Sequence, residues 1–100
     1  MTEDMMMVMV VYNEAVDMEV MEALEKSGLK NYTKTSGAYG RGSSSGTHLG
    51  NDIWPGLNNV LYVACSQKEA QRLMSEVRQL RPSLRREGVK AFAWRLEDAT

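Results

Sequence analysis

Eight consecutive apolar residues near the start of the chain, Met5 to Tyr12, restrict what the rest of the sequence can build around them. The run is shorter than an ordinary helix and contains several β-branched valines, so we expect a buried strand there. Successive strand residues point to opposite sides of a sheet, so this strand places apolar side chains on both faces. It also falls well short of the roughly 20 apolar residues that a membrane-spanning helix needs.

The first helix is predicted over residues 13–27, where apolar residues recur at helical spacing and most acidic residues lie outside that stripe. Asn13 or Asp17 is placed to cap its start, and Gly28 stands where a C-terminal cap belongs. The apolar stripe consists of Val16, Val20, Ala23 and Leu24.

The second helix is predicted to begin after Ser66, because Glu69 follows three residues later in the pattern of a capping box. Pro82 disfavours helical backbone at Arg81, so we expect the helix to end there. Its apolar stripe consists of Ala70, Leu73, Met74, Val77 and Leu80.

Three further strands are predicted at residues 32–36, 59–65 and 89–96. Residues 37–56 contain six glycines and three consecutive serines, which predicts a long loop of a length that is usually functional or disordered. The order β-α-β-β-α-β predicts an α+β, ferredoxin-like sandwich. It has one antiparallel four-stranded sheet, both helices on one face, and a long insertion between the second and third strands.

Two helices cover only one face of such a sheet, so the other face should be polar at every second residue. Residues 5–12, 59–65 and 89–96 are instead apolar at both odd and even positions. A sheet that is apolar on both faces needs a second cover, and another copy of the chain is the simplest one. The sequence therefore predicts an oligomer.

Chain length, cysteine count and charge limit the class of protein that this sequence can encode. We expect a single domain over residues 1–100, and the one cysteine excludes an internal disulfide framework. A net charge of −1 is unlike that of a protein that coats nucleic acid. Because the chain shows neither a membrane-spanning run nor a secretory signal, we expect a cytoplasmic location. Residues 1–25 hold seven acids and no Lys or Arg, whereas residues 78–95 hold six bases and one acid. The basic segment is either a solvated face or a site for an anion such as phosphate.

The stretch Gly37-Ala38-Tyr39-Gly40-Arg41-Gly42 resembles a glycine–aromatic–glycine–arginine element of the PII-like signalling superfamily, with one residue added. In that family the element leads into a flexible T-loop, which residues 41–57 resemble. Residues 82–90 stand where the family has its B-loop. The B-loop is poorer in glycine than usual, and Gly42 replaces a usual glutamine, so the chain is identified as a divergent member of the nitrogen regulatory PII-like proteins.

The resemblance implies a homotrimer with clefts between its subunits. There the T-loop base and the B-loop would hold a small anionic effector such as ATP, ADP or AMP. The loop would pass the signal to a transporter or an enzyme, and His48 and Trp54 are its candidate partner-binding residues. The effector-binding residues implied are Gly37, Tyr39, Gly40, Arg41, Gly42, Arg85, Arg86, Gly88 and Lys90.

Other functions are less well supported by the residues. There is no nucleophile–base pair, paired-carboxylate site or metal motif, which argues against an enzyme, and Cys65 is interpreted as a buried structural thiol. His48 has no second histidine with which to share a metal. A CutA-like trimer with a metal-related or structural role and an amino-acid-binding ACT-type domain share the element order. RNA binding through an open sheet would need aromatic residues in the first strand, so no nucleic-acid partner is expected.

Overall fold

The computed structural model describes residues 5–39, 57–84 and 88–100. The elements occur in the order β-α-β-β-α-β, with two short 3-10 turns beside the helices. They are β1 (Met5–Asn13), η2 (Glu14–Val16), α1 (Asp17–Lys26), β2 (Thr33–Tyr39), β3 (Leu57–Ser66), α3 (Gln67–Leu80), η4 (Arg81–Leu84) and β4 (Val89–Arg95).

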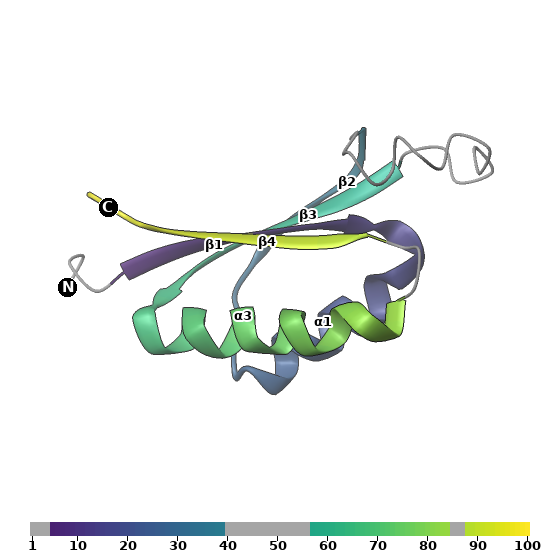
Figure 1. Cartoon of the computed structure of the whole chain (residues 1–100). Helices are drawn as coiled ribbons and strands as arrows, with labels where there is room; N and C mark the ends of the chain where they lie inside the picture. The colour runs from purple at the N-terminus through teal and green to yellow at the C-terminus, as the bar shows by residue number, and fades with distance from the viewer. Residues whose placement is uncertain (1–4, 40–56, 85–87) are drawn as a thin grey trace.

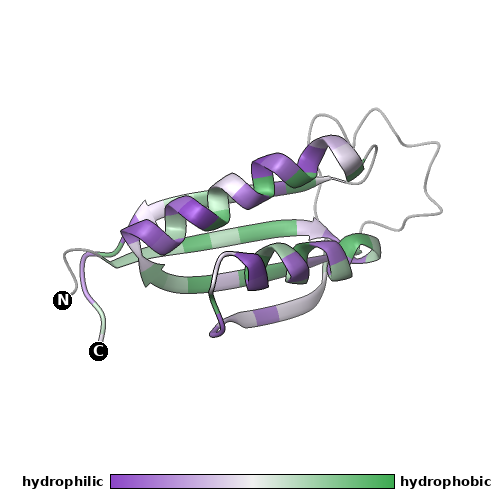
Figure 2. Cartoon of the chain, turned by 90° about the horizontal axis from the view of Figure 1, so that it is seen from below, coloured by the Kyte–Doolittle hydropathy of each residue, from purple (hydrophilic) through white to green (hydrophobic). Residues whose placement is uncertain are grey.

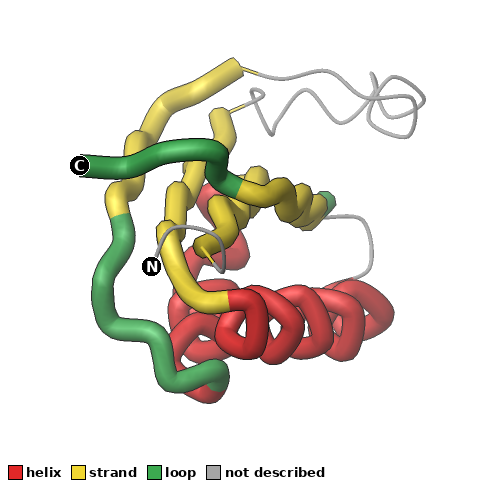
Figure 3. Tube along the Cα trace, turned by 90° about the vertical axis from the view of Figure 1, so that its left-hand side faces the viewer, coloured by secondary structure: helices red, strands yellow, loops and turns green. Residues whose placement is uncertain are grey.

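The four strands form one sheet in the order β2-β3-β1-β4, and every neighbouring pair is antiparallel. Both helices lie against the same face of this sheet (Figure 1), and the view along the strands shows the same two layers (Figure 3). The predicted ferredoxin-like sandwich is confirmed. No helix in the described ranges is both long and apolar enough to pass through a membrane.

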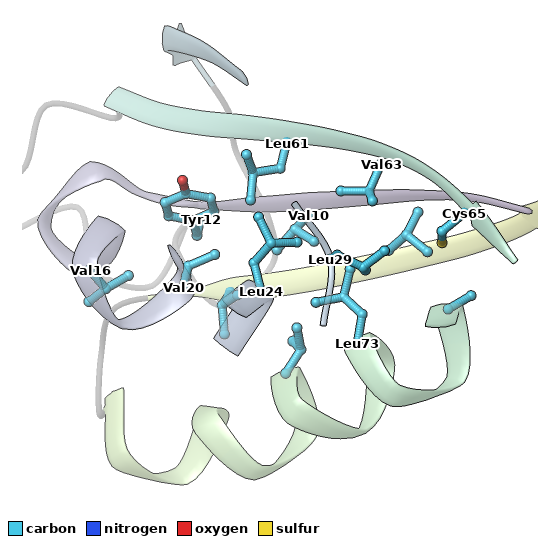
Figure 4. Packing of buried hydrophobic residues seen from close by; sticks show 14 of the residues in the cluster. Val10, Tyr12, Val16, Val20, Leu24, Leu29, Leu61, Val63, Cys65 and Leu73 are labelled. Atoms are coloured by element: carbon cyan, nitrogen blue, oxygen red, sulfur yellow. The ribbon is translucent and has the colours of Figure 1, made fainter. Parts of the chain in front are cut away.

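The hydrophobic core fills the space between the sheet and the helices (Figure 4). In the middle of the sheet, Val8 pairs with Val63 and Val10 with Leu61, and all four side chains are fully buried. Each buried aliphatic side chain of this kind stabilises the fold by roughly 1.5–3 kcal/mol. The helices complete the core with Val20, Ala23 and Leu24 from α1 and Ala70, Leu73 and Val77 from α3.

The first helical segment differs from the prediction of one helix over residues 13–27. The Asn13 side chain accepts a hydrogen bond from the Ala15 N–H at 2.8 Å and caps the short turn η2, after which α1 begins. The Asp17 side chain does not cap the start of α1, which follows Val16; its carboxylate instead accepts hydrogen bonds from the strands. Gly28 has a φ of +84° and closes the helix, as predicted, through its N–H to Glu25 O.

The second helix begins as predicted. The Glu69 N–H donates to Ser66 Oγ at 3.2 Å, and the Ser66 N–H donates to Glu69 Oε1 at 2.9 Å, which together form the capping box. The helix ends at Leu80, and the turn η4 accommodates Pro82.

Strand β2 is longer than predicted, because it continues through Gly37 to Tyr39. Its pairing advances from Thr35 to Ala38 while β3 moves only from Val60 to Asn58, so β2 contains one extra residue. Gly37 lies at this bulge with a φ of +76°, a conformation that glycine adopts without steric cost. The glycine therefore bends the strand instead of ending it. At the other side of the gap Leu57, which was predicted to belong to the loop, begins β3.

Candidate functional site

Strands β1 and β2 end, and β3 and β4 begin, at the same end of the sheet (Figure 1). Asn58 of β3 pairs with Asn13 of β1 and with Ala38 of β2, and Tyr12 pairs with Val89 of β4. The Asn13 N–H also donates to Gly88 O at 3.3 Å. The points at which residues 40–56 and 85–87 join the described chain therefore lie at the same end of the sheet, although they are far apart in sequence.

Four of the predicted effector-binding residues belong to the described chain, and they lie at or near this end of the sheet. Gly37 and Tyr39 are in β2, Gly88 precedes β4, and Lys90 is its second residue. Tyr39 is 84% exposed, and Gly88 and Lys90 are also exposed. The other predicted site residues lie outside the described residues; these are Gly40, Arg41, Gly42, His48, Trp54, Arg85 and Arg86.

The bulge at Gly37 sets the side of the sheet to which Tyr39 belongs. Ala38 pairs with Asn58, which alternates with the buried Asn59, so Ala38 lies on the sheet face away from the helices. Tyr39, opposite Leu57, then lies on the helix side. Without the extra residue the alternation would be reversed, because a shift of one residue moves a side chain to the other face.

Lys90 lies on the face away from the helices, opposite Val11 of β1. Val11 in turn pairs with Val60, and Val60 with Thr35, so the lysine ends a row of otherwise uncharged residues. Its ammonium group is an exposed positive charge close to the points where residues 40–56 and 85–87 join the described chain. Such a group binds a phosphate or carboxylate oxygen as a point charge.

A polar cluster supports this end of the sheet from the helix side. The Asp17 carboxylate accepts hydrogen bonds from the Tyr12 hydroxyl at 2.5 Å, Lys34 Nζ at 3.1 Å and Asn59 Nδ2 at 3.1 Å. One carboxylate thus joins α1 to β1, β2 and β3. The sequence does not predict this role; there Asp17 is only one of two candidates, with Asn13, for the cap of the first helix.

The cluster shifts the pKa values of Asp17 and Tyr12. Burial raises the pKa of Asp17, but the hydrogen bonds from Tyr12, Lys34 and Asn59 and the positive charge of Lys34 outweigh it, so the pKa is lower than usual. Burial and the Asp17 carboxylate raise the pKa of the Tyr12 hydroxyl well above its usual value. The hydroxyl therefore remains a hydrogen-bond donor throughout the physiological range. Asn59 Oδ1 is buried and has no partner among the described residues.

The sheet face away from the helices, which we call the open face, is largely apolar. Met9 pairs with Tyr62 on one side and Phe92 on the other, and Met7 pairs with Ala64 and Trp94. Phe92 is 48% exposed and Trp94 is 43% exposed. The predicted two-sided apolar character is thus confirmed for β1, β3 and β4. A patch of this kind on a protein surface marks a site of association.

No group of three or more His, Cys, Asp or Glu side chains suited to a metal ion occurs in the described ranges. Cys65 is buried in the core, as predicted. Burial, together with the nearby Glu69 carboxylate, raises the pKa of its thiol. A thiol held protonated in this way is a poor nucleophile and a poor metal ligand.

Comparison with known families gives one match that spans nearly the whole chain. The model of the family described as nitrogen regulatory protein P-II matches residues 5–100. No curated protein sequence matches the chain.

Several solved structures share the fold. A PII-like signaling protein from Thermus thermophilus is 24% identical, with a TM-score of 0.63, over 92% of this chain and 86% of that one. CPII from Thiomonas intermedia, bound to ADP, AMP and acetate, is 16% identical, with a TM-score of 0.63, over 94% of this chain and 89% of that one. Its complex with ADP, AMP and bicarbonate gives 14% identity and a TM-score of 0.61 over 96% of each chain.

Proposed function

The chain belongs to the nitrogen regulatory protein P-II family, and from that premise we propose that it is a regulatory protein whose effector is an adenine nucleotide. The effector would bind at the end of the sheet where β2, β3 and β4 meet residues 40–56 and 85–87. Residues 1–100 would act as one signalling domain without a catalytic role of its own.

The observation that carries this proposal is that the ends of β2 and β1 and the starts of β3 and β4 lie at one end of the sheet. Ala38 and Asn13 share Asn58 as their pairing partner, and Asn13 is hydrogen-bonded to Gly88. Both sequence segments that contain glycine and arginine therefore start from the same end of the sheet. Backbone N–H groups of glycine-rich segments and a few cations are the groups that a phosphate needs.

The proposed binding residues are the predicted ones. Lys90, on the open face of edge strand β4, supplies an exposed charge at this end of the sheet, and Tyr39, on the helix side of the other edge strand β2, supplies an exposed aromatic ring. Arg41, Arg85 and Arg86 would add charges from the adjoining segments. The nucleotide-bound structures of CPII support the choice of ligand class, because that protein has the same fold.

The open face supports an oligomer, which we propose to be a trimer. Copies of the chain would cover Tyr62, Phe92 and Trp94 by packing on this face. Lys90 lies on the same face at the end nearest the proposed site, so it would sit at the border between subunits. The effector cleft would then be completed by a neighbouring copy.

Residues 41–57 would transmit the signal to a partner protein. Effector binding would order this segment, and a transporter or an enzyme would recognise the ordered form. His48 and Trp54 would contact that partner. Their position between β2 and β3 connects them directly to the strand ends that form the site.

The test is a calorimetric titration of the purified protein with ATP, ADP, AMP, bicarbonate and divalent metal ions, with the mass in solution measured alongside. At least one of the three adenine nucleotides should bind, and the mass in solution should be that of a trimer. Arg41→Ala and Lys90→Ala should each weaken nucleotide binding at least about tenfold, equivalent to about 1.4 kcal/mol. Arg72→Ala and Lys68→Ala, exposed residues of α3, are the matched controls and should change little.

The other results separate the alternatives. A metal ion that binds tightly while every nucleotide fails would favour the CutA-like role. Nucleotide binding that is unchanged by both Arg41→Ala and Lys90→Ala would contradict the proposed site but not the effector class.

A further inference from the structure

A groove on the helix side of the molecule is not used by the proposed function. It lies between α1 and residues 28–32, which lead from the helix to β2, and has a volume of about 590 Å³. We call it the α1 groove. Its apolar walls include Met18, Met21, Leu29 and Tyr32.

The positions of the exposed apolar side chains distinguish this groove from the rest of the described surface. Six large hydrophobic residues of the described chain are exposed. Tyr62, Phe92 and Trp94 belong to the open face, and Tyr39 belongs to the proposed effector site. The remaining two are Met18, 82% exposed, and Tyr32, 46% exposed, and both line the α1 groove. The two exposed apolar residues that belong neither to the open face nor to the proposed effector site therefore both line the α1 groove.

The groove would stay accessible in an oligomer built through the open face. Figure 2 looks onto the helix layer, where α1 lies on the side of the molecule away from that face. The groove and the open face are thus separate surfaces, and a partner can occupy one while copies of the chain cover the other.

The charges around the groove are mainly negative. Asp17, Glu22 and Glu25 line it, against Lys30. Asp17 is paired with Lys34, but Glu22 and Glu25 are exposed and make no ion pair with any described residue. Two free carboxylates therefore border an apolar floor. Such a border favours a cationic partner and raises its rate of encounter.

We propose that the α1 groove binds a basic, amphipathic peptide segment of a partner protein. The apolar side chains of the peptide would lie against Met18, Met21 and Tyr32, and its Lys or Arg residues would face Glu22 and Glu25. An amphipathic helix laid into an apolar groove is a recurrent mode of recognition. Methionine suits it, because its flexible and polarizable side chain adapts to differently shaped partners.

The probe is a fluorescein-labelled peptide of about 18 residues, built from Lys and Leu at helical spacing and measured by anisotropy against the full chain. Two other peptides serve as comparisons: one carries Glu at every Lys position, and one has the Lys/Leu composition in scrambled order. The basic amphipathic peptide should bind at least about tenfold more tightly than either comparison.

Two variants test whether the peptide binds in the α1 groove. The double charge reversal E22K/E25K should weaken the basic peptide about tenfold, and Met18→Ser should weaken it severalfold. E97K/D98K makes the same change in net charge at exposed residues beyond β4 and should leave the affinity within about twofold. Equal losses in the two double variants, equal binding of all three peptides, or no binding of the basic peptide would overturn the proposal. None of these results depends on nucleotide binding.

Discussion

Lys34 Nζ lies 3.1 Å from Asp17 Oδ1, and this ion pair ties the strand that leads toward the proposed site to the first turn of α1. The same carboxylate accepts hydrogen bonds from Tyr12 and Asn59. A substitution of Asp17 therefore removes hydrogen bonds to three strands, β1, β2 and β3.

Asp17→Asn should destabilise the chain by about 1–2 kcal/mol at neutral pH, because a charged acceptor is replaced by a neutral one. The lowered pKa of Asp17 makes this effect depend on pH. Its stabilising contribution is fully present above the unfolded pKa of about 3.9 and disappears as the pH falls through the lower folded pKa. Urea unfolding across this range should show the two proteins converging in acid. Glu19→Gln, an exposed site on the same helix, is the control, and parallel curves for wild type and Asp17→Asn would contradict this role of the carboxylate.

Gly37→Ala should cost about 1–2 kcal/mol of unfolding free energy, because an alanine is strained at a φ of +76°. Apart from the adjoining residues of the chain, no heavy atom lies within 4 Å of the added methyl group, so the cost comes from the backbone and not from a clash. Gly88→Ala also adds its methyl group to open space, and Gly88 does not have a positive φ of this kind. It should leave stability nearly unchanged. Urea denaturation of both variants checks this, and equal stability of the two would show that the bulge does not need its glycine.

Two substitutions on opposite faces of the sheet should have separable effects. Leu61 is fully buried against the helices, so Leu61→Ala should lower the unfolding free energy by about 2–5 kcal/mol. Phe92 lies on the open face, so Phe92→Glu should reduce the mass in solution by placing a charge in the contact between copies. Light scattering and urea unfolding measure the two effects. An oligomer of unchanged mass in Phe92→Glu would contradict assembly through this face.

The fold could be predicted from the sequence because its signals are local. The spacing of Leu73 and Val77 marks a helix, the pair Ser66 and Glu69 marks its start, and runs that are apolar at both odd and even positions mark the two-sided strands. Each of these patterns depends on residues close in sequence. The helix boundary at Asn13 was less accurate, because a short turn and a helix have similar apolar spacing.

The polar cluster and the bulge could not be predicted in the same way. Asp17 meets Lys34 and Asn59 across separations of 17 and 42 residues, and local spacing carries no information on such contacts. Gly37 was interpreted as the start of a loop, since a glycine after a short strand usually ends it. Only the pairing of Ala38 with Asn58 shows that the strand continues. The arginines of the predicted site stay predictions, because they lie outside the described residues.

The central claim is that an adenine nucleotide binds at the end of the sheet where residues 40–56 and 85–87 join β2, β3 and β4. A ¹H–¹⁵N correlation spectrum of the uniformly labelled protein, recorded during titration with ADP, tests it residue by residue. We expect the amide signals of Tyr39, Asn58 and Gly88 to shift together and saturate, while those of Lys68 and Arg72 in the first half of α3 remain in place. Shifts confined to the α1 groove, or a spectrum unchanged by ADP, ATP and AMP alike, would contradict it.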